Sequence, residues 1–457
     1  MKYNRIIIFK RIIVLLVFLI GFSVLQVQGS DDEEQFLDLF KKVYKKLRDE
    51  YVEKKDPKDL LLGAINGMIR TLDDPHTALL SPQQKEELSI ETKGEYGGLG
   101  IVIGVRDNIL TVISPMEDTP AEKAGILAGD KIIKIENEPV KDPILNEVVN
   151  KLRGTPGTKV TISVEREGLD ELLDYTMTRQ IIKLKAIKST VIDNKIGYIK
   201  IISFNRNAPR ELEKALRGMK KRKVKSLILD VRNNPGGLLD VAVNIVDLFI
   251  SEGLIVYTRA REGVFNIFLN KDYYANKNTT MVSDDVSLAV LINHGSASAS
   301  EIFAGAIQDH KKGVLVGVKS FGKGSVQSVI NLDGYGLRYT TAYYYTPGGR
   351  LIHKKGIEPD IEVKPLILTK KEMANIEEIR KKGYIKQFLK EKTDYNDEDI
   401  KNLRKKLVSE DLDLDEPIIR GLVKNEKYRN KKAPIYDLDT DLQLKMAVQL
   451  VSLKAMK

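Results

Sequence analysis

The chain has 457 residues, of which 42% are hydrophobic and 30% are charged. This length and balance allow two or three hydrophobic cores and exclude a wholly disordered protein. The 74 basic and 64 acidic residues give a net charge of +10, but both signs are interspersed, which is typical of a solvated basic surface rather than of nucleic-acid binding. Cysteine is absent, so disulfides, thiolate nucleophiles and cysteine-based zinc sites are excluded.

Residues 1–29 have the pattern of an export signal. Basic residues, the last of them Arg11, precede an apolar run from Ile12 to Leu25, and small and polar residues follow. The run of about 14 residues is shorter than the ~20 that a helix needs to span a bilayer, so cleavage near Gly29 is favoured over a retained membrane anchor. We therefore expect an exported protein of the periplasm or cell envelope, associated with the membrane only if the signal is uncleaved.

The rest of the chain falls into four regions. Residues 30–89 have apolar positions at helical spacing and predict a helical N-terminal region. Residues 90–170 contain short β-branched runs between Gly, Pro, Asn and Asp turns, with two helix candidates. Strand-like and helix-like segments alternate over 180–365, which predicts an α/β core with substantial parallel pairing. Residues 366–457 are rich in Lys and Glu at helical spacing and predict a C-terminal helical region.

A glycine-rich turn, Gly97-Gly98-Leu99-Gly100-Ile101, opens the β-rich region. Consecutive backbone N–H groups in such a turn can hold a carboxylate, and the following strand edge can accept a peptide as an added strand. Together with the segment SPMEDTPAEKAGILAGDKIIKIENEPV, it resembles a circularly permuted bacterial PDZ domain over about 94–167. The resemblance implies that Gly98, Leu99, Gly100 and Ile101 bind the C-terminal tail of a peptide.

A serine-rich run, NHGSASASE, follows the buried-looking strand SLAVLI and opens a helix. Backbone N–H groups and the helix dipole at such a junction can stabilise an oxyanion, although serines are also ordinary helix N-caps. The segment GVKSFGKGS further on misses the phosphate-loop pattern, because Gly324 stands where the Mg²⁺-binding hydroxyl is required. A lysine between glycines can instead be pressed into an apolar site, where it loses its proton more easily and can serve as the base for a serine.

No Ser, His, Asp set competes with this reading. The G-x-S-x-G elbow of the hydrolases is absent, and the histidines are scattered over different segments, at His76, His294, His310 and His353. Glu301 lies beside the serines, but an acidic residue in the first turn of a helix is favoured by the macrodipole alone, so we expect it to be structural.

Two strings together, NHGSASASEIFAGAIQD and VGVKSFGKGSVQ, resemble the carboxyl-terminal processing peptidases, also called tail-specific proteases. The resemblance extends over roughly 35–457 through strings such as LILDVRNNPGGLL and YYTPGGRLIHKKGIEPDIEV. It implies a crotonase-like α/β protease core with an inserted PDZ domain and helical segments at both ends.

The resemblance also implies roles for single residues. The nucleophile is the middle serine of the run, Ser298, with Ser296 and Ser300 as rivals, and the general base is Lys323, 25 residues later. The other implied residues are a glutamine that orients the lysine, an accessory aspartate on the nucleophile's helix face, and the N–H donors of an oxyanion hole: Gln327, Asp309, Ala299, Gly237 and Gly236.

One geometric condition follows for the lysine segment. Lys323 and Gln327 would stand about 13 Å apart on a straight strand. A bend at Gly322 or Gly324 is therefore expected.

These observations predict a serine endopeptidase that needs no metal or organic cofactor. Its partners would be proteins with accessible C-terminal tails, not nucleic acid, and the terminal helical segments suit a homodimer. One other reading keeps the same architecture but makes the protein a PDZ scaffold without proteolytic activity. Another is a hydratase-like enzyme acting on acyl thioesters, since the core of the family it resembles is crotonase-like, but the PDZ module, the export signal and the Ser-to-Lys spacing argue against it.

Overall fold

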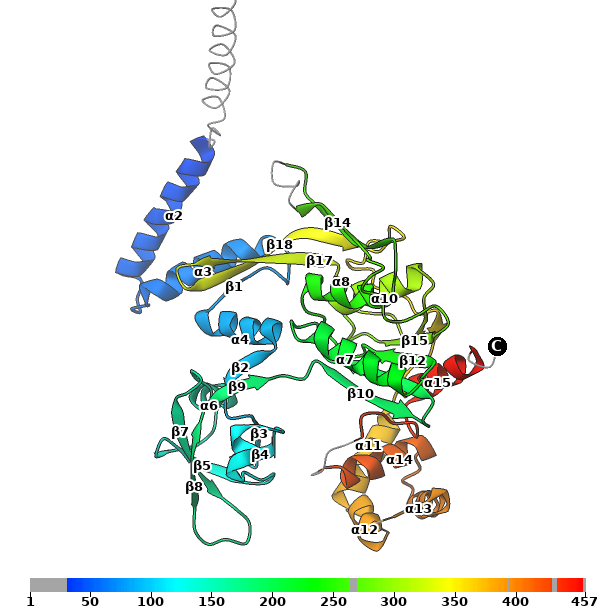
Figure 1. Ribbon diagram of the computed structural model, residues 1–457. Coiled ribbons are helices and arrows are strands. Elements are labelled where there is room, and N and C mark those ends of the chain that lie inside the picture. The colour runs from blue at the N-terminus through cyan, green and yellow to red at the C-terminus, as the bar shows by residue number, and fades with distance from the viewer. Residues whose placement is uncertain (1–30, 264–268, 393, 430–433, 455–457) are drawn as a thin grey trace, which may run out of the picture. The chain divides into compact units, whose positions relative to one another are not determined.

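The computed structural model describes residues 31–263, 269–392, 394–429 and 434–454 (Figure 1). The export segment expected at residues 1–29 lies outside these ranges. The chain divides into two compact units: residues up to Leu79 with Leu337–Tyr339, and Leu80–Gly336 with Thr340–Lys457. Within the described ranges, no helix is both long and apolar enough to cross a membrane.

The first unit is helical, as its periodicity predicts. Helices α2 (Asp31–Glu50) and α3 (Pro57–Arg70) are separated where the sequence places an Asp-Pro pair. The Asp56 side chain accepts a hydrogen bond from the Lys58 N–H, and proline at the first helical position leaves no donor unsatisfied. Two local signals, a cap and a proline, therefore set the start of α3.

Helix α4 (Pro82–Lys93) follows the short strand β1 (Ala78–Leu80) and continues past residue 89. Ser81 and Gln84 form a capping box, in which each side chain accepts the other residue's N–H. The helix ends at Gly94, whose φ of +73° fits the left-handed cap that glycine favours.

After α4, the second unit continues with a β-rich module, residues 95–183. Its main sheet has the strand order β3-β4-β5-β7-β8, with β6 beside β5, and a separate pair joins β2 to β9. The predicted glycine-rich turn is in part a strand, because Gly97 and Gly98 pair with β9, and only Leu99 and Gly100 form the turn into β3. The elements are β2 (Glu95–Gly98), β3 (Ile101–Arg106), β4 (Ile109–Pro115), α5 (Pro120–Ala124), β5 (Lys131–Ile135), β6 (Glu138–Pro139), α6 (Leu145–Leu152), β7 (Lys159–Glu165), β8 (Leu173–Thr178) and β9 (Gln180–Lys183).

The core sheet has the order β10-β11-β12-β15-β16-β19. Every pair from β11 to β19 is parallel, and only β10 is antiparallel to its neighbour, which confirms the predicted α/β core. Its elements are β10 (Ile187–Ile192), β11 (Ile196–Ile201), α7 (Ala208–Lys221), β12 (Ser226–Asp230), α8 (Leu239–Asp247), β15 (Ser287–Ile292), α10 (Ala299–Asp309), β16 (Val314–Gly317), β19 (Ile361–Glu362) and α15 (Leu442–Lys454).

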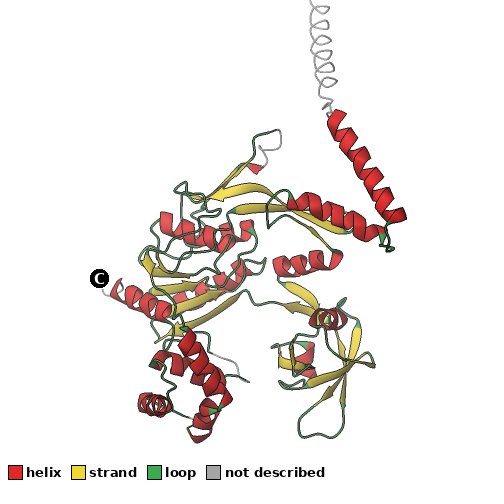
Figure 2. Ribbon diagram, turned by 180° about the vertical axis from the view of Figure 1, so that it is seen from behind, coloured by secondary structure: helices red, strands yellow, loops and turns green. Residues whose placement is uncertain are grey.

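Both faces of this sheet are buried (Figure 2). Alternate residues such as Leu229 and Val290 pack with α7, α8 and α10, whereas Ile228 and Leu291 pack with α15. Burial on both faces explains why strands such as SLAVLI are continuous hydrophobic runs without alternation.

Two further groups complete the second unit. A mainly antiparallel sheet contains β13 (Leu254–Ala260), β14 (Lys271–Tyr274), β17 (Ser325–Leu332) and β18 (Tyr335–Tyr345). A helical cluster with its own core contains α11 (Lys370–Lys381), α12 (Tyr384–Glu391), α13 (Asp397–Ser409) and α14 (Glu416–Lys427), in keeping with the predicted helical C-terminal region.

Candidate active site

Ser298 occupies a strained turn between β15 and α10. Its φ of +55° and ψ of −115° are rare for a residue with a side chain and persist only where the surroundings impose them. Ser298 is half-buried, whereas Ser296 and Ser300 are fully buried. Their hydroxyls donate to the carbonyls of Val231 and Asn234, at 2.8 and 2.9 Å. The two rival serines therefore hold the turn, and Ser298 is the one that reaches the surface.

The Pro-Gly-Gly loop after β12 lies against this turn. A Cβ on Gly236 would stand 2.8 Å from both the Ala299 nitrogen and the Ser298 Cβ, so only glycine allows this approach. The Gly236 N–H donates to the Asn234 side chain at 2.9 Å and is already used. The Gly236 carbonyl and the Leu238 N–H are both hydrogen-bonded to the backbone of Phe204. Gly237 lies between them, and its own N–H therefore points away from Phe204.

The Ala299 N–H is the second candidate oxyanion donor. It belongs to the first residue of α10, and N–H groups in the first turn of a helix have no partner within the helix. Together with the N–H of Gly237, it can provide the pair of donors that an oxyanion requires.

The Glu301 carboxylate joins the serine turn to the lysine loop. Its Oε2 accepts the backbone N–H of Ser298 at 2.9 Å and that of Lys323 at 2.8 Å. Its Oε1 accepts the Ser320 hydroxyl at 2.6 Å and the Gly322 N–H at 2.7 Å. Glu301 is fully buried, and this burial raises its pKa although the four hydrogen bonds act in the opposite direction.

The lysine loop turns at Gly322, directly before Lys323. Gly322 has a φ of +93°, and β17 begins only at Ser325. A Cβ on Gly324 would stand 2.2 Å from the backbone nitrogen of His353. Lys323 itself is half-buried. Because the two glycines have no side chains, the backbone on either side of Lys323 can lie against neighbouring chain segments.

Gln327 and Asp309 occupy different surroundings. The Gln327 amide nitrogen donates to the hydroxyls of Ser325, at 2.8 Å, and Thr340, at 3.2 Å. Asp309 ends α10, about 15 Å along the axis from its start, and accepts the Gly348 N–H and the Arg350 guanidinium. Asp309 thus fixes the turn after β18 and is not brought to Ser298.

The expected peptide site is a groove in the β-rich module. A pocket of about 80 Å³ is lined by residues of the turn, β3 and α6: Tyr96, Gly98, Leu99, Gly100, Ile101, Ile103, Val149, Leu152 and Arg153. All four predicted peptide-binding residues line it. Gly100 has a φ of +77°, and a Cβ there would stand 2.4 Å from the Thr119 side chain, so the turn requires glycine.

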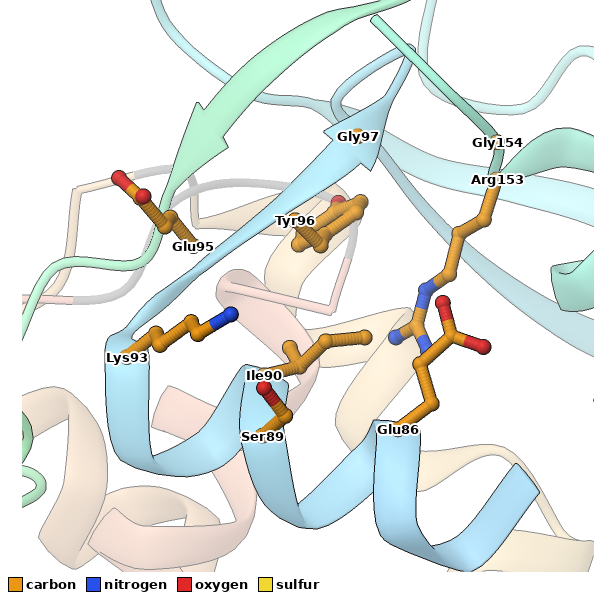
Figure 3. Close-up of a pocket in the computed structure, with 9 residues that line it drawn as sticks. All are labelled: Glu86, Ser89, Ile90, Lys93, Glu95, Tyr96, Gly97, Arg153 and Gly154. Atoms are coloured by element: carbon orange, nitrogen blue, oxygen red, sulfur yellow. The ribbon is translucent and has the colours of Figure 1, made fainter. Parts of the chain in front are cut away.

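A second pocket, of about 210 Å³, adjoins this groove (Figure 3). Helix α4 provides one wall, and the two pockets share Tyr96 and Arg153. The Arg153 guanidinium lies 4.9 Å from the centre of the Tyr96 ring, and Arg153 and Glu86 both line this second pocket. A change at either shared residue would therefore affect both pockets.

A metal site is not found in the described part of the chain, where no three His, Asp or Glu side chains gather to bind an ion. The candidate site brings together the serine turn, the lysine loop and the buried Glu301 carboxylate. With a peptide groove in a separate module, this is the organisation of a PDZ-containing serine protease.

Comparison with known proteins gives the same result. Three family models match in chain order: the activating protease CtpB N-terminal domain over residues 23–83, the PDZ domain over 111–166 and peptidase family S41 over 195–363. The carboxy-terminal-processing protease of Bartonella bacilliformis is 43% identical over 329 residues, which cover 71% of this chain and 74% of that protein. The chain belongs to the carboxyl-terminal processing proteases of peptidase family S41.

Two further similarities are found. The carboxyl-terminal-processing protease of Synechocystis is 38% identical over 330 residues, covering 70% of this chain and 75% of that one. The solved structure of a photosystem II D1 C-terminal processing protease is 31% identical, with a TM-score of 0.42, and covers 72% of this chain and 88% of that one.

Two residues of the site escaped the sequence analysis in part. From the sequence, Glu301 is expected only to support its helix, although a carboxylate three residues after a serine at a strand-to-helix junction is a usable signal. Tyr344, in the string YYYTPGG, has no local signal, because only the packing of β18 brings its hydroxyl to the main-chain carbonyl of Lys323.

Proposed function

We propose that this protein is an exported endopeptidase that recognises substrates by their C-terminal tails and cleaves them with Ser298 as nucleophile and Lys323 as general base. The observation that carries the proposal is the convergence of the Ser298 and Lys323 N–H groups on one oxygen of Glu301. Two loops far apart in the sequence are thereby held together at the half-exposed serine. A serine and a lysine so placed can perform acyl transfer without a third, histidine, member.

Substrate capture is assigned to the groove of the β-rich module. The backbone N–H groups of Gly98, Leu99 and Gly100 would hold the terminal carboxylate, and the edge of β3 would accept the tail as an added strand. A disordered tail can then enter a narrow site from which a folded domain is excluded.

The chemistry runs through an acyl-enzyme. Ser298 Oγ attacks the peptide carbonyl carbon while its proton passes to the Lys323 amine. The C–N bond breaks as the leaving amine takes that proton, and water then hydrolyses the ester. We assign Gln327 to orienting the lysine, since its amide nitrogen is engaged by two hydroxyls and its carbonyl oxygen is the atom able to accept from an ammonium.

The developing negative charge would be bound by the N–H groups of Ala299 and Gly237. Gly236 has a supporting part, because its own N–H is occupied and its missing side chain leaves the space open. Each donor in such a hole is worth about a hundredfold or more in rate. No metal or organic cofactor enters this scheme.

We assign the chain to an export signal (1–29), an N-terminal helical region (30–89), a PDZ domain (90–170), a protease core (180–365) and a C-terminal helical region (366–457). The exported protein would act in the periplasm or cell envelope on other proteins, not on nucleic acid. The exposed apolar residues of α2, among them Phe36 and Phe40, support assembly into a homodimer.

The test is cleavage of an unstructured protein that ends in an apolar C-terminal tail. The wild-type enzyme should cleave it, whereas Ser298→Ala and Lys323→Ala should not. Two exposed residues provide matched controls, Ser283→Ala and Lys319→Ala, which should retain activity. Cleavage by either site variant would exclude the assigned pair, and full function of Ser298→Ala in every assay would favour a scaffold instead.

A further inference from the structure

Asn234 is a buried residue of the Pro-Gly-Gly loop, and its side chain makes two hydrogen bonds. The side-chain oxygen accepts the Gly236 N–H at 2.9 Å, and the amide nitrogen donates to the Ile201 carbonyl at 2.8 Å. A main-chain N–H can only donate and a carbonyl can only accept, so one orientation of the amide satisfies both partners. Only 1% of the residue's surface is exposed, and loss of either bond would therefore leave a buried polar group unsatisfied.

The bond to Gly236 determines which N–H of the loop is left for an oxyanion. An asparagine that accepts the N–H two residues later forms an Asx-turn. Pro235, in the middle of this turn, has no N–H, and the Gly236 N–H is used by the asparagine. Gly237 therefore carries the first N–H that the turn does not use. Gly237 is also exposed, whereas Gly236 is buried.

The main-chain carbonyl of Asn234 holds the serine turn. It accepts the Ala297 N–H at 3.0 Å and the Ser300 hydroxyl at 2.9 Å. These two residues lie on either side of Ser298 and Ala299. Asn234 is thus bonded to both segments that carry the assigned oxyanion donors, and the relative position of the two donors depends on it.

A second asparagine holds the same loop from the neighbouring strand. The side-chain oxygen of Asn293, directly after β15, accepts the Asn233 N–H at 2.9 Å and the Gly295 N–H at 3.0 Å. Its amide nitrogen donates to the Asn233 side chain at 2.9 Å. Asn233 has a φ of +56°, in the left-handed region that asparagine tolerates. The residue before Asn234 is therefore fixed to the segment that leads into the serine turn.

We propose that Asn234 is a positioning residue of the oxyanion hole, which holds the Gly237 N–H beside that of Ala299, and that Asn293 supports it by holding the same loop. This inference rests on the proposed function, because it presumes that Ser298 forms a tetrahedral intermediate at these donors. Oxyanion donors act because they are already in place when charge develops. A displaced loop should therefore lower the rate of the chemical step without weakening substrate capture.

Two variants of Asn234 separate its hydrogen bonds. Asn234→Ala removes both side-chain bonds. Asn234→Ser restores an oxygen that can accept the Gly236 N–H, since serine forms the same kind of turn more weakly. If the bond to Gly236 positions the donor, Asn234→Ser should be less impaired than Asn234→Ala.

The measurement compares two peptide substrates with the same apolar C-terminal tail. The first has ordinary peptide bonds, and its cleavage position is located by mass spectrometry. In the second, the carbonyl oxygen at that position is replaced by sulfur. Sulfur then carries the developing charge and is a weaker hydrogen-bond acceptor than oxygen. The ratio of kcat for the oxygen substrate to kcat for the sulfur substrate therefore reports on the oxyanion donors, whereas a general structural defect lowers both rates alike.

In Asn234→Ala the oxygen-to-sulfur ratio should fall about tenfold, because one oxyanion donor is worth about a hundredfold or more in rate and is displaced rather than removed. KM for the oxygen substrate should stay close to the wild-type value. Asn375→Ala is the matched control, because it removes another buried asparagine whose amide donates to a main-chain carbonyl, at 3.0 Å, within the C-terminal helical cluster. Its ratio should equal that of wild type. An unchanged ratio in Asn234→Ala would overturn the inference.

Asn293→Ala carries the test if Asn234→Ala does not fold, because Asn293 is only partly buried. Its ratio should fall in the same direction, and an unchanged ratio in the folded variant would then overturn the inference. Ser298→Ala tests the proposed function separately. Cleavage of the oxygen substrate by Ser298→Ala would show that the nucleophile is wrongly assigned. An inactive Ser298→Ala with an unchanged ratio in the asparagine variants would contradict only the positioning role.

Discussion

At the scale of single residues, the buried Glu301 carboxylate holds two backbone segments in position. Four donors surround its carboxylate, and a buried carboxylate is tolerated only with such partners. Ser298 has an unfavourable φ, so something must hold the turn that presents it. Glu301 does this while binding the lysine loop with the same oxygen.

Replacing Glu301 by Gln should therefore lower activity and stability together. The amide nitrogen must face at least one backbone N–H, because Oε1 accepts one such group and Oε2 accepts two. We expect a loss of about 1–3 kcal/mol in the free energy of unfolding, the usual cost of an unsatisfied buried donor, and at least a tenfold loss in kcat. Urea unfolding and peptide cleavage measure the two effects, and Glu358→Gln, at an exposed position, is the control. Wild-type activity in Glu301→Gln would contradict this role.

Gly236 provides a second test at this scale. In Gly236→Ala the added methyl group would stand 2.8 Å from the Ala299 nitrogen, in the space where the oxyanion is expected. We predict at least a hundredfold loss in kcat, the effect of losing one oxyanion donor, with little change in KM. Gly218→Ala is the matched control, because its methyl group meets nothing within 4 Å and it lies inside α7, where alanine is favoured by about 0.5–1 kcal/mol. Full activity of Gly236→Ala would exclude the assigned oxyanion site.

At the scale of elements, one buried ion network fastens helix α15 to the core sheet. Arg232 follows β12, and its guanidinium binds both Asp230 and Asp441, at 2.7 and 2.6 Å. Tyr198 donates to Asp230 at 2.7 Å, and Gln443 accepts from Arg232 at 3.0 Å. The last helix of the chain is therefore tied to the strand that leads into the Pro-Gly-Gly loop.

Arg232→Met should loosen this attachment, because it leaves Asp230 buried without its partner. Removing one member of a buried pair costs about 3–5 kcal/mol, so we expect a loss of that size in the free energy of unfolding. Chemical denaturation measures it. Arg217→Met removes an exposed pair with Glu213 and should change the stability by less than about 0.5 kcal/mol. An Arg232→Met protein as stable as wild type would show that the network does not stabilise the fold.

The same network predicts how stability depends on pH. Asp230 is buried, which alone would raise its pKa, but Arg232 and Tyr198 hold the pKa below the ordinary 3.8. A lowered carboxylate pKa contributes stability that is present above the unfolded value and is lost as pH falls through the folded value. The stabilising effect of Asp230 should thus persist at pH 5 and disappear only below about pH 3.8. Denaturation of wild type and Asp230→Asn across this range checks the sign, since their difference should shrink only at the acid end.

At the scale of the whole molecule, recognition and cleavage are assigned to separate modules of one chain. The proposed division predicts that damage to the groove changes substrate capture more than chemistry. It also places the tail-binding residues far from Ser298 in the sequence. The role of the groove can be tested separately from cleavage by changing only the C-terminal tail of the substrate.

Gly100→Ala should raise KM for a tailed substrate with little effect on kcat. Its φ is positive, and the new methyl group would stand 2.4 Å from Thr119, so the carboxylate-binding turn must shift. Amidating the substrate's C-terminus should raise KM of the wild-type enzyme in the same way and have less effect on Gly100→Ala. Gly125→Ala, also at a positive φ but with open space around it, controls for backbone strain. Equal KM values for substrates with free and amidated tails would contradict the proposal that the groove binds the terminal carboxylate.

The sequence by itself determined the family, the α/β core and the helical ends, since these depend on local periodicity, caps and turn residues. The comparisons and the parallel core sheet confirm them, while Ser298, Lys323 and Gln327 remain predictions from the family pattern. Only the tertiary structure decided that Ser296 and Ser300 are buried supports, that Asp309 fixes a distant turn, and that Glu301 contacts both loops of the site. The reason is physical: local patterns specify elements, but the contacts that join the loops around residues 298 and 323 form only when separate elements pack together.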